Sequence, residues 1–285
     1  MWVPQEGGWS TAIALPRVPN DHIVVPSLAL LDTRAADFAV VLNQGNAAWH
    51  LSPTSRTANM PPDADPRVTT HIDYFHCRAE LDAPTLTISV AAPQPPQHFL
   101  LTVSAREFAR TPDPGMKTTQ RLIVAPISQL TAPRNLRHRI CSPTSLLMVL
   151  DYHGIDASLA GVTRDCLHAP SGMFGVWPLA IRTAADAGLV AAVECFTSLD
   201  AIAPVLERGL PVVASIRFAS GTLPGAALDA TDGHLVVITG FDRDWVYIND
   251  PAAKDASAVP RQCPRDAFAA AWLARRGAAY IVGTR

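Results

Sequence analysis

Three residue types that together perform nucleophilic catalysis occur at informative places in the second half of the chain. Cys141 stands directly before the most regular helical pattern of the sequence, which stops at Gly154. The unpaired N–H groups and the positive end of the dipole at a helix start favour a thiolate over a thiol. Arg137, His138 and Arg139, just upstream, add positive charge. These features make Cys141 a candidate nucleophile.

A nucleophilic cysteine also needs a nearby base and a third group that orients the base. His234 opens a strongly apolar segment, and the next strand-like segment, 245–249, is followed by Asp250. If the two segments form an antiparallel hairpin, the end of the second lies near the start of the first. The sequence thus predicts a Cys, His, Asp triad, with Asn249 as the alternative third member. Spacing alone leaves a buried cysteine and a capped histidine as the other interpretation.

The elements that must position these residues combine helices and strands. The helix after Cys141 is expected to use Ser142 or a neighbour as its N-cap, with Pro143 in the first turn. Further helical patterns cover 157–167, 177–187, 199–208 and 265–275, and strand patterns cover 190–196, 211–218, 234–241, 245–249 and 280–282. Helices precede strands here, which predicts an α+β fold for this part.

The first part of the chain has a different texture, with short β-rich runs separated by Pro, Asn and Asp clusters. Candidate strands are 23–31, 38–43, 69–76, 85–91 and 99–105. Several strands at this spacing predict an all-β, sandwich-like domain. The Pro- and Gly-rich segment 111–115 marks the boundary, so we expect an all-β domain at 1–115 and the α+β domain at 116–285.

Composition excludes several classes of protein. The chain has 285 residues, of which 48% are hydrophobic and 17% charged, so disorder and coiled coil are excluded. The net charge of −2 lacks the positive excess that is typical of proteins that bind nucleic acids or anionic membranes. No segment has the apolar length of a transmembrane helix, and the start lacks the layout of a secretory signal, so we expect a cytoplasmic protein.

The remaining cysteines and histidines do not indicate a metal or cofactor site. The five cysteines are an odd number without a C-x-x-C pair, which argues against a disulfide framework or zinc knuckle. We assign Cys166, Cys195 and Cys263 to packing. The segment 71–77 (HIDYFHC) is metal-like in composition, but on a strand His71 and Asp73 would face away from His76. Nucleotide-binding loops, zincin helices and serine-hydrolase elbows are absent from the sequence.

Three motifs carry a resemblance to a known family. CSPTSLLMVL at 141–150, GHLVV at 233–237 and INDPA at 248–252 resemble the bacteriocin-leader-processing peptidases, the double-glycine leader peptidases of family thirty-nine. The similarity continues through GVWP at 175–178, AADAGL at 184–189 and GLPVV at 209–213. It covers roughly residues 120–285 and is greatest to a stand-alone bacterial subgroup. The resemblance implies a papain-like fold without a cofactor or metal.

The resemblance also implies roles for single residues. Cys141 would be the nucleophile, His234 the general base and then acid, and Asp250 the group that orients the imidazole. Ser128-Gln129 resembles a pair that precedes the cysteine in the subgroup, so Gln129 is the candidate oxyanion donor beside the backbone N–H of Cys141. The loop from 130 to 140 departs from the family pattern, because it lacks a Gly-rich and aromatic lead-in.

These expectations lead to a cysteine peptidase that acts on a peptide or protein substrate through a thioester. If an amine rather than water resolves the thioester, the protein is instead an amide-forming acyltransferase. The alternative from another class is a binding or scaffold protein that acts through its β domain, which resembles the subgroup weakly at 68–75. That domain would present a peptide or glycan, or merely cover the catalytic domain. Trp177 would line the cleft or serve packing.

Overall fold

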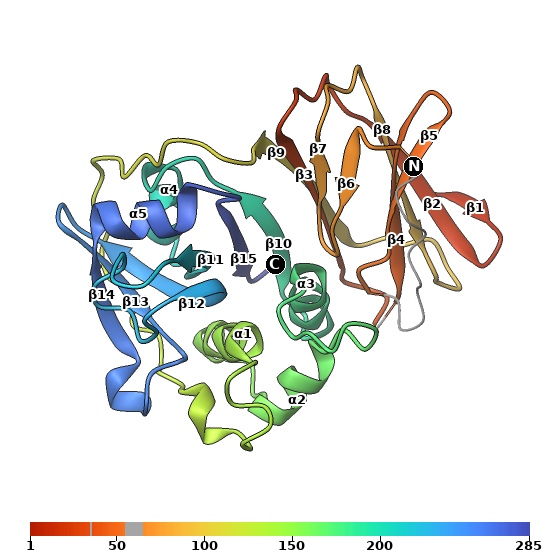
Figure 1. The fold of residues 1–285 in the computed structure, drawn as a ribbon. Helices are drawn as coiled ribbons and strands as arrows, with labels where there is room; N and C mark the ends of the chain where they lie inside the picture. Colours follow the sequence, from red (N-terminus) through yellow and green to blue (C-terminus); the bar gives the residue numbers. More distant parts are fainter. Residues whose placement is uncertain (35, 55–64) are drawn as a thin grey trace.

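The computed structural model describes residues 1–34, 36–54 and 65–285. Its described residues up to 107 hold nine strands, and a mixture of helices and strands follows (Figure 1). The strands of the first part are β1 (Val3–Gln5), β2 (Gly8–Ala14), β3 (His22–Leu30), β4 (Phe38–Gln44), β5 (Ala47–Leu51), β6 (Val68–Thr70), β7 (Phe75–Cys77), β8 (Thr85–Val90) and β9 (Phe99–Glu107). Among these, β1, β2 and β5 were not anticipated from the sequence.

The strands of the first part form two antiparallel sheets. Their orders are β1-β2-β8-β4-β5 and β6-β7-β3-β9. One hydrophobic cluster, with Leu42, Phe75 and Ile88 among its members, draws side chains from both sheets. Burial alternates along β4 and β8, as expected for strands with one face on a core. The core of this part therefore lies between its two sheets.

Strand β3 differs from β4 and β8 because it is buried on both faces. Val24 and Leu28 belong to the cluster between the two sheets. Ile23 and Val25, which point the other way, belong to a second cluster that includes residues of the helices after Cys141. Strand β3 accordingly joins the hydrophobic cores of the two parts of the chain.

The strand expected at 69–76 is divided. Strands β6 and β7 flank residues 71–74, which form a bend and not a strand. The expectation that His71 and Asp73 share one strand face is therefore wrong, because the alternation of side chains requires continuous extended backbone. The imidazole of His76 instead bonds with Asp21, at 2.7 Å between Nε2 and Oδ1.

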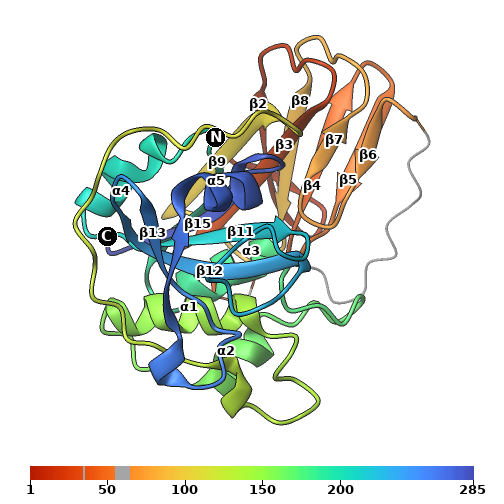
Figure 2. The ribbon, with the colours of Figure 1, turned by 60° about the vertical axis from the view of Figure 1, so that its left-hand side comes forward.

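The second part is built on an antiparallel sheet of order β10-β15-β11-β12-β13-β14. Its strands are β10 (Val190–Cys195), β11 (Val212–Phe218), β12 (Thr231–Phe241), β13 (Trp245–Asn249), β14 (Pro260–Pro264) and β15 (Ala278–Gly283). The helices are η1 (Gln129–Thr131), α1 (Cys141–Tyr152), α2 (Leu159–Asp165), α3 (Trp177–Asp186), η2 (Asp200–Ile202), α4 (Ala203–Glu207), η3 (Ala256–Ala258) and α5 (Arg265–Leu273). Figure 2 shows α1 and α2 below β11 and β12, and α5 above them.

Alternation along the central strands explains these layers. In β11, Val213 packs in the cluster with α1 and α3, whereas its neighbours Val212 and Ala214 pack in the cluster with α5. Each face of the sheet is thus covered by helices, which is why β11 and β12 read as continuous apolar runs. None of the helices in the described ranges has the length and apolar character needed to span a bilayer.

Most predicted elements of this part occur, with shifted ends. The helix expected at 199–208 is divided into η2 and α4, and β14 was not anticipated. The expectation of Ser142 as the N-cap of α1 is wrong, because the cap is Ile140 and the helix already includes Cys141. The Ser142 hydroxyl lies in the first turn, 3.0 Å from the Tyr280 hydroxyl, and so is engaged elsewhere.

The two parts meet at β10, an edge strand of the six-stranded sheet. Strands β3 and β9 pack along it (Figure 1). The Ser27 hydroxyl accepts a hydrogen bond from Val193 N at 2.9 Å, and the Ser104 hydroxyl accepts one from Cys195 N at 3.2 Å. Two serines of the first part therefore satisfy backbone donors that a free strand edge leaves unpaired.

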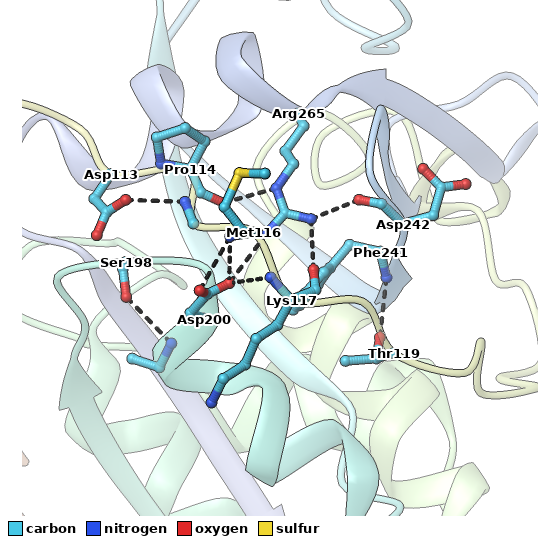
Figure 3. A network of polar contacts seen from close by, with 12 residues as sticks. Asp113, Pro114, Met116, Lys117, Thr119, Ser198, Asp200, Phe241, Asp242 and Arg265 are labelled. Carbon is cyan, nitrogen blue, oxygen red and sulfur yellow. Dashed lines mark hydrogen bonds and ion pairs between the residues drawn. The ribbon is translucent and has the colours of Figure 1, made fainter.

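The segment that joins the parts is fastened to the second part by a polar network (Figure 3). The Asp200 carboxylate accepts hydrogen bonds from Met116 N at 2.9 Å and Lys117 N at 2.7 Å. Arg265 donates to the carbonyls of Pro114 and Lys117, both at 2.7 Å, and pairs with Asp200 at 3.2 Å. The link following residue 112 is thus held in one path by an aspartate and an arginine that are distant in sequence.

Candidate active site

The structure brings Cys141, His234 and Asp250 together. Cys141 is the first residue of α1, His234 lies in β12, and Asp250 directly follows β13. His234 Nε2 is 2.7 Å from Asp250 Oδ1, and the Cys141 thiol bonds with the same imidazole. Because Asp250 occupies Nε2, the ring nitrogen that serves Cys141 is Nδ1.

Strand register explains how Asp250 reaches His234. Strands β12 and β13 form the antiparallel hairpin that the sequence predicts, with Val237 opposite Asn249. The residue after Asn249 therefore lies beside the start of β12, where His234 is located. Both side chains are buried, with 2% of His234 and none of Asp250 exposed.

The structure also separates the two candidates for the third position. Asp250 accepts hydrogen bonds from Ala227 N at 2.9 Å and Ala252 N at 3.0 Å, besides its contact with His234. Asn249 instead donates its amide to Val124 O at 2.9 Å. Successive residues at the end of a strand point to opposite sides, so only Asp250 contacts the imidazole.

The surroundings of Cys141 favour its ionised form. Burial alone would raise the pKa of this thiol, but the hydrogen bond and charge of His234, with the backbone N–H groups of Leu235 and Ser142, lower the pKa below its ordinary value. Ile140 at the N-cap has no side-chain acceptor for the first N–H groups of α1. Of these groups, the backbone N–H of Ser142 is directed at the sulfur.

The histidine and the aspartate shift in the complementary sense. Burial works against a charged imidazole, yet the hydrogen bonds of His234 to Asp250 and Cys141 raise its pKa to about 10. Burial likewise works against the Asp250 carboxylate, but His234 and the two backbone donors lower its pKa. The arrangement therefore stabilises a thiolate, an imidazolium and a carboxylate in a row.

Gln129 lies beside the loop that follows Asp250. It begins η1, and its backbone N–H donates to Pro251 O at 2.9 Å. The Ser128 hydroxyl fixes the same segment by donating to Ala253 O at 2.5 Å. The Gln129 side chain is 4% exposed, and its Oε1 has no hydrogen-bond partner among the described residues. Gln129 does not line the cleft at Cys141, so the structure places it near the site only through the loop that follows Asp250.

A cleft of about 460 Å³ opens at Cys141. It is lined from the second part by residues that include Cys141, Trp177, Leu235 and Arg276, and from the first part by residues 71–74. Trp177, which is 3% exposed, both lines the cleft and packs in the core. The wall formed by 71–74 was not predicted, because the sequence of this segment is typical of a strand.

The other four cysteines have the opposite electrostatic setting. Burial raises the pKa of Cys77 to about 11 and the pKa of Cys166, Cys195 and Cys263 to about 12. All five cysteines are free thiols. Cys141 is thus the one described cysteine whose surroundings favour a thiolate.

A comparison with models of protein families identifies the family of the chain. The model of the Peptidase_C39 like family matches residues 121–280. A solved double glycine motif protease from an AMS/PCAT transporter, in complex with a leader peptide, is 22% identical and has a TM-score of 0.40; the match covers 60% of this chain and 100% of that one. A solved C39-like peptidase from Bacillus anthracis is 21% identical with a TM-score of 0.44, over 58% of this chain and 98% of that one. No curated protein matches the chain.

Proposed function

The chain belongs to the C39-like peptidase family, as its motifs predict, and from that premise we propose that it cleaves peptide bonds through Cys141, His234 and Asp250. Family membership supports a cysteine-peptidase function in general. The observation that carries the specific proposal is the contact of one buried imidazole with both Cys141 and Asp250. We propose a papain-like arrangement for this part, and an all-β sandwich domain for residues 1–115.

The proposed reaction begins with attack of the Cys141 thiolate on the carbonyl carbon of the scissile amide. The carbonyl π electrons move to the oxygen, and a tetrahedral intermediate forms. As the intermediate collapses, the C–N bond breaks and the leaving amine takes the proton of the His234 imidazolium. The product of this half-reaction is a thioester between Cys141 and the acyl part of the substrate.

The second half-reaction regenerates the enzyme. Neutral His234 removes a proton from a water molecule as the water oxygen attacks the thioester carbonyl. The C–S bond breaks, the carboxylic acid leaves, and the thiolate and imidazolium are restored. Throughout, Asp250 holds the imidazole in the orientation that directs Nδ1 toward the sulfur and stabilises its protonated form.

The oxyanion of the intermediate needs donors that are already in place. We assign this role to the backbone N–H of Cys141, at the start of α1, and to the side-chain amide of Gln129. The support for Gln129 is that its side chain is buried and that its backbone N–H is bonded to Pro251 O in the loop that follows Asp250; the donor would be its Nε2 amide group. One donor of this kind contributes about 3 kcal/mol in related chemistry.

The proposal is tested by incubating a broad peptide library with the wild-type protein, Cys141→Ala and Cys166→Ala, and identifying new termini by mass spectrometry. We expect cleavage by the wild type and by Cys166→Ala, and none by Cys141→Ala, with equal circular dichroism for all three. Adding glycinamide separates hydrolysis from acyl transfer, because a transferase gives mainly the amide product although water is in large excess. Unchanged cleavage by Cys141→Ala contradicts the proposal.

A further inference from the structure

Two guanidinium groups line the same cleft as Cys141. Arg276 lies over the rings of Trp177 and Tyr74, at 5.2 and 5.6 Å from their centroids. Arg139 lies over Phe174 at 5.5 Å and donates to a backbone carbonyl. Stacking on an aromatic face holds a guanidinium plane in place while its N–H edge stays available for a bidentate partner.

The charges of the cleft do not cancel within the protein. Among the described residues, neither Arg139 nor Arg276 has a carboxylate within ion-pair distance. Of the two carboxyl groups that line the cleft, Asp232 pairs with Arg217 at 2.7 Å. The other, Asp73, accepts the backbone N–H of Trp177 at 3.4 Å, at the start of α3. Two guanidinium groups therefore face one carboxyl group without an ion-pair partner, although the chain as a whole has a net charge of −2.

The remaining carboxyl group compensates these charges only partly. Burial raises the pKa of Asp73 to about 6, against the opposing effect of Arg276. A single carboxyl group, even when ionised, balances only one of the two guanidinium charges. The N-terminal end of α1 adds a partial positive charge to that of the guanidinium groups.

We propose that Arg276, assisted by Arg139, binds a carboxylate group of the substrate and gives the peptidase a preference for acidic peptides. The proposal rests on the proposed function, since it assigns the substrate of the same cleft. Arg276 also hydrogen-bonds with the Tyr74 side chain, and its guanidinium, with its plane fixed by two rings, presents the remaining N–H donors to a carboxylate. The carboxylate is either an Asp or Glu side chain or the C-terminal group of the peptide.

The proposal gives the first part of the chain a share in specificity. Tyr74, the last residue of the bend at 71–74, stacks with Trp177 of α3 at 5.9 Å, and together they support Arg276. The Arg276 guanidinium is therefore held by one aromatic ring from each part of the chain, Tyr74 from the first and Trp177 from the second. Arg276 is a specificity-determining residue in this scheme and takes no part in bond breaking.

The test uses Cys141 itself as the reporter, so that it does not depend on knowing a cleavable substrate. N-iodoacetyl dipeptide amides that end in Glu or Gln are matched probes, and a third probe ends in Gln with a free C-terminal carboxylate. The rate of alkylation of Cys141 by each probe is measured by peptide mass spectrometry in the wild type, Arg276→Gln and Arg275→Gln. Arg275 is the matched control, because it lies over Phe108 at 5.4 Å and does not line the cleft.

We expect at least one carboxylate probe to label wild-type Cys141 about tenfold faster than the Gln amide, as for loss of one charge-assisted contact. Arg276→Gln should remove this ratio, Arg139→Gln should reduce it, and Arg275→Gln should retain it. Of the two carboxylate probes, faster labelling by the Glu amide indicates recognition of a side-chain carboxylate, and faster labelling by the free C-terminal Gln indicates recognition of the C-terminal group. Arg276→Lys, which keeps the charge but loses the paired donors, should give an intermediate ratio and covers the case in which Arg276→Gln is unfolded.

Equal labelling of the wild type by all three probes overturns the proposal, as does a ratio that Arg276→Gln and Arg276→Lys leave unchanged. Failure of the proposed function has a different signature. In that case Cys141 reacts with iodoacetamide no faster than an ordinary thiol at neutral pH, and the wild type leaves the peptide library intact. The carboxylate preference and the catalytic competence of Cys141 are therefore judged by separate readouts.

Discussion

Cys141 and Cys166 lie at opposite kinds of helix end and have opposite electrostatic settings. Cys141 is the first residue of α1, while Cys166 is the C-cap of α2. Burial works against the thiolate at both positions. Hydrogen bonds from His234 and two backbone N–H groups nevertheless lower the pKa of Cys141, whereas the pKa of Cys166 is raised to about 12.

The contrast indicates that hydrogen-bond donors, and not burial, decide which of the two thiols has the lowered pKa. Around Cys166 the single polar side chain in contact is the Thr183 hydroxyl, 3.6 Å from the sulfur, among the described residues. The carbonyl end of α2 adds the unfavourable end of a helix dipole. The start of a helix together with a neighbouring imidazole thus distinguishes the candidate nucleophile from a cysteine that serves packing.

The largest expected effect on turnover comes from replacing the sulfur of Cys141 by oxygen, and the same replacement at Cys166 is its control. Cys141→Ser should lower kcat/KM by about 10⁴-fold or more, because a hydroxyl does not form an ion pair with the imidazolium. Cys166→Ser should leave kcat/KM within about threefold, since Cys166 contacts no reacting group. Turnover of a peptide cleaved by the wild type measures both. Comparable losses in the two variants would contradict the assigned difference.

The next effect concerns the group behind the imidazole. Asp250→Asn should lower kcat/KM by about 10² to 10⁴-fold, because the amide favours the wrong tautomer of His234. Asn249→Ala should lower stability by about 1–3 kcal/mol through the loss of its bond to Val124 O, with little effect on kcat/KM of the folded protein.

Urea unfolding and turnover, measured on the same samples, separate these outcomes for Asp250→Asn and Asn249→Ala. Equal and small effects of both on turnover would move the third triad position to another residue.

A smaller effect is expected in the pH dependence of alkylation. Below its lowered pKa Cys141 is protonated and unreactive, so its rate with iodoacetamide should rise with pH and level off below the ordinary cysteine pKa of 9.0. Activity should fall again as His234 loses its proton at about 10. In His234→Ala the alkylation profile should move to higher pH, because the main donor to the sulfur is gone. Peptide mass spectrometry follows Cys141 and Cys166 in one sample.

If the alkylation rate of Cys141 depends on pH as that of an ordinary thiol does, in both the wild type and His234→Ala, then the pKa of Cys141 is not lowered and the contrast with Cys166 is contradicted. Cys166 should stay unlabelled over this range while the protein is folded.

The smallest effect is on stability at the unreactive site. Cys166→Ala removes a buried sulfur and leaves a small cavity, so we expect a loss of about 1 kcal/mol in the free energy of unfolding. Its turnover should equal that of the wild type. A thermal melt with a parallel activity assay measures both, and a loss of turnover without a loss of stability would assign Cys166 a role beyond packing.

The elements that carry Cys141, His234 and Asp250 could be predicted from the sequence. Helix α1 and the hairpin of β12 and β13 follow from local apolar patterns, and β13 occurs at its predicted bounds. Pairing in a hairpin is close in sequence, so the approach of Asp250 to His234 could be deduced from strand register. The N-cap of α1 could not be predicted from the sequence, because serine is a better capping residue than isoleucine and the sequence therefore favours Ser142 over Ile140.

The cleft walls depend on contacts that no local pattern encodes. Residues 71–74 contain neither Gly nor Pro and alternate like a strand, yet they bend toward α3, where Asp73 and Tyr74 meet Trp177. Arg276 is recognisable only once Tyr74 and Trp177 are in place. Long-range packing overrides local propensity at these positions.

The serines that cap β10 bear on how the two parts depend on one another. Without residues 1–112, Val193 N and Cys195 N would lose the hydroxyl groups of Ser27 and Ser104, and the apolar surface of α3 that packs on β3 would be wetted. An uncovered strand edge beside apolar surface is a template for self-association. The first part therefore covers an edge and an apolar face of the second part, and we expect a chain shortened to its second part to aggregate.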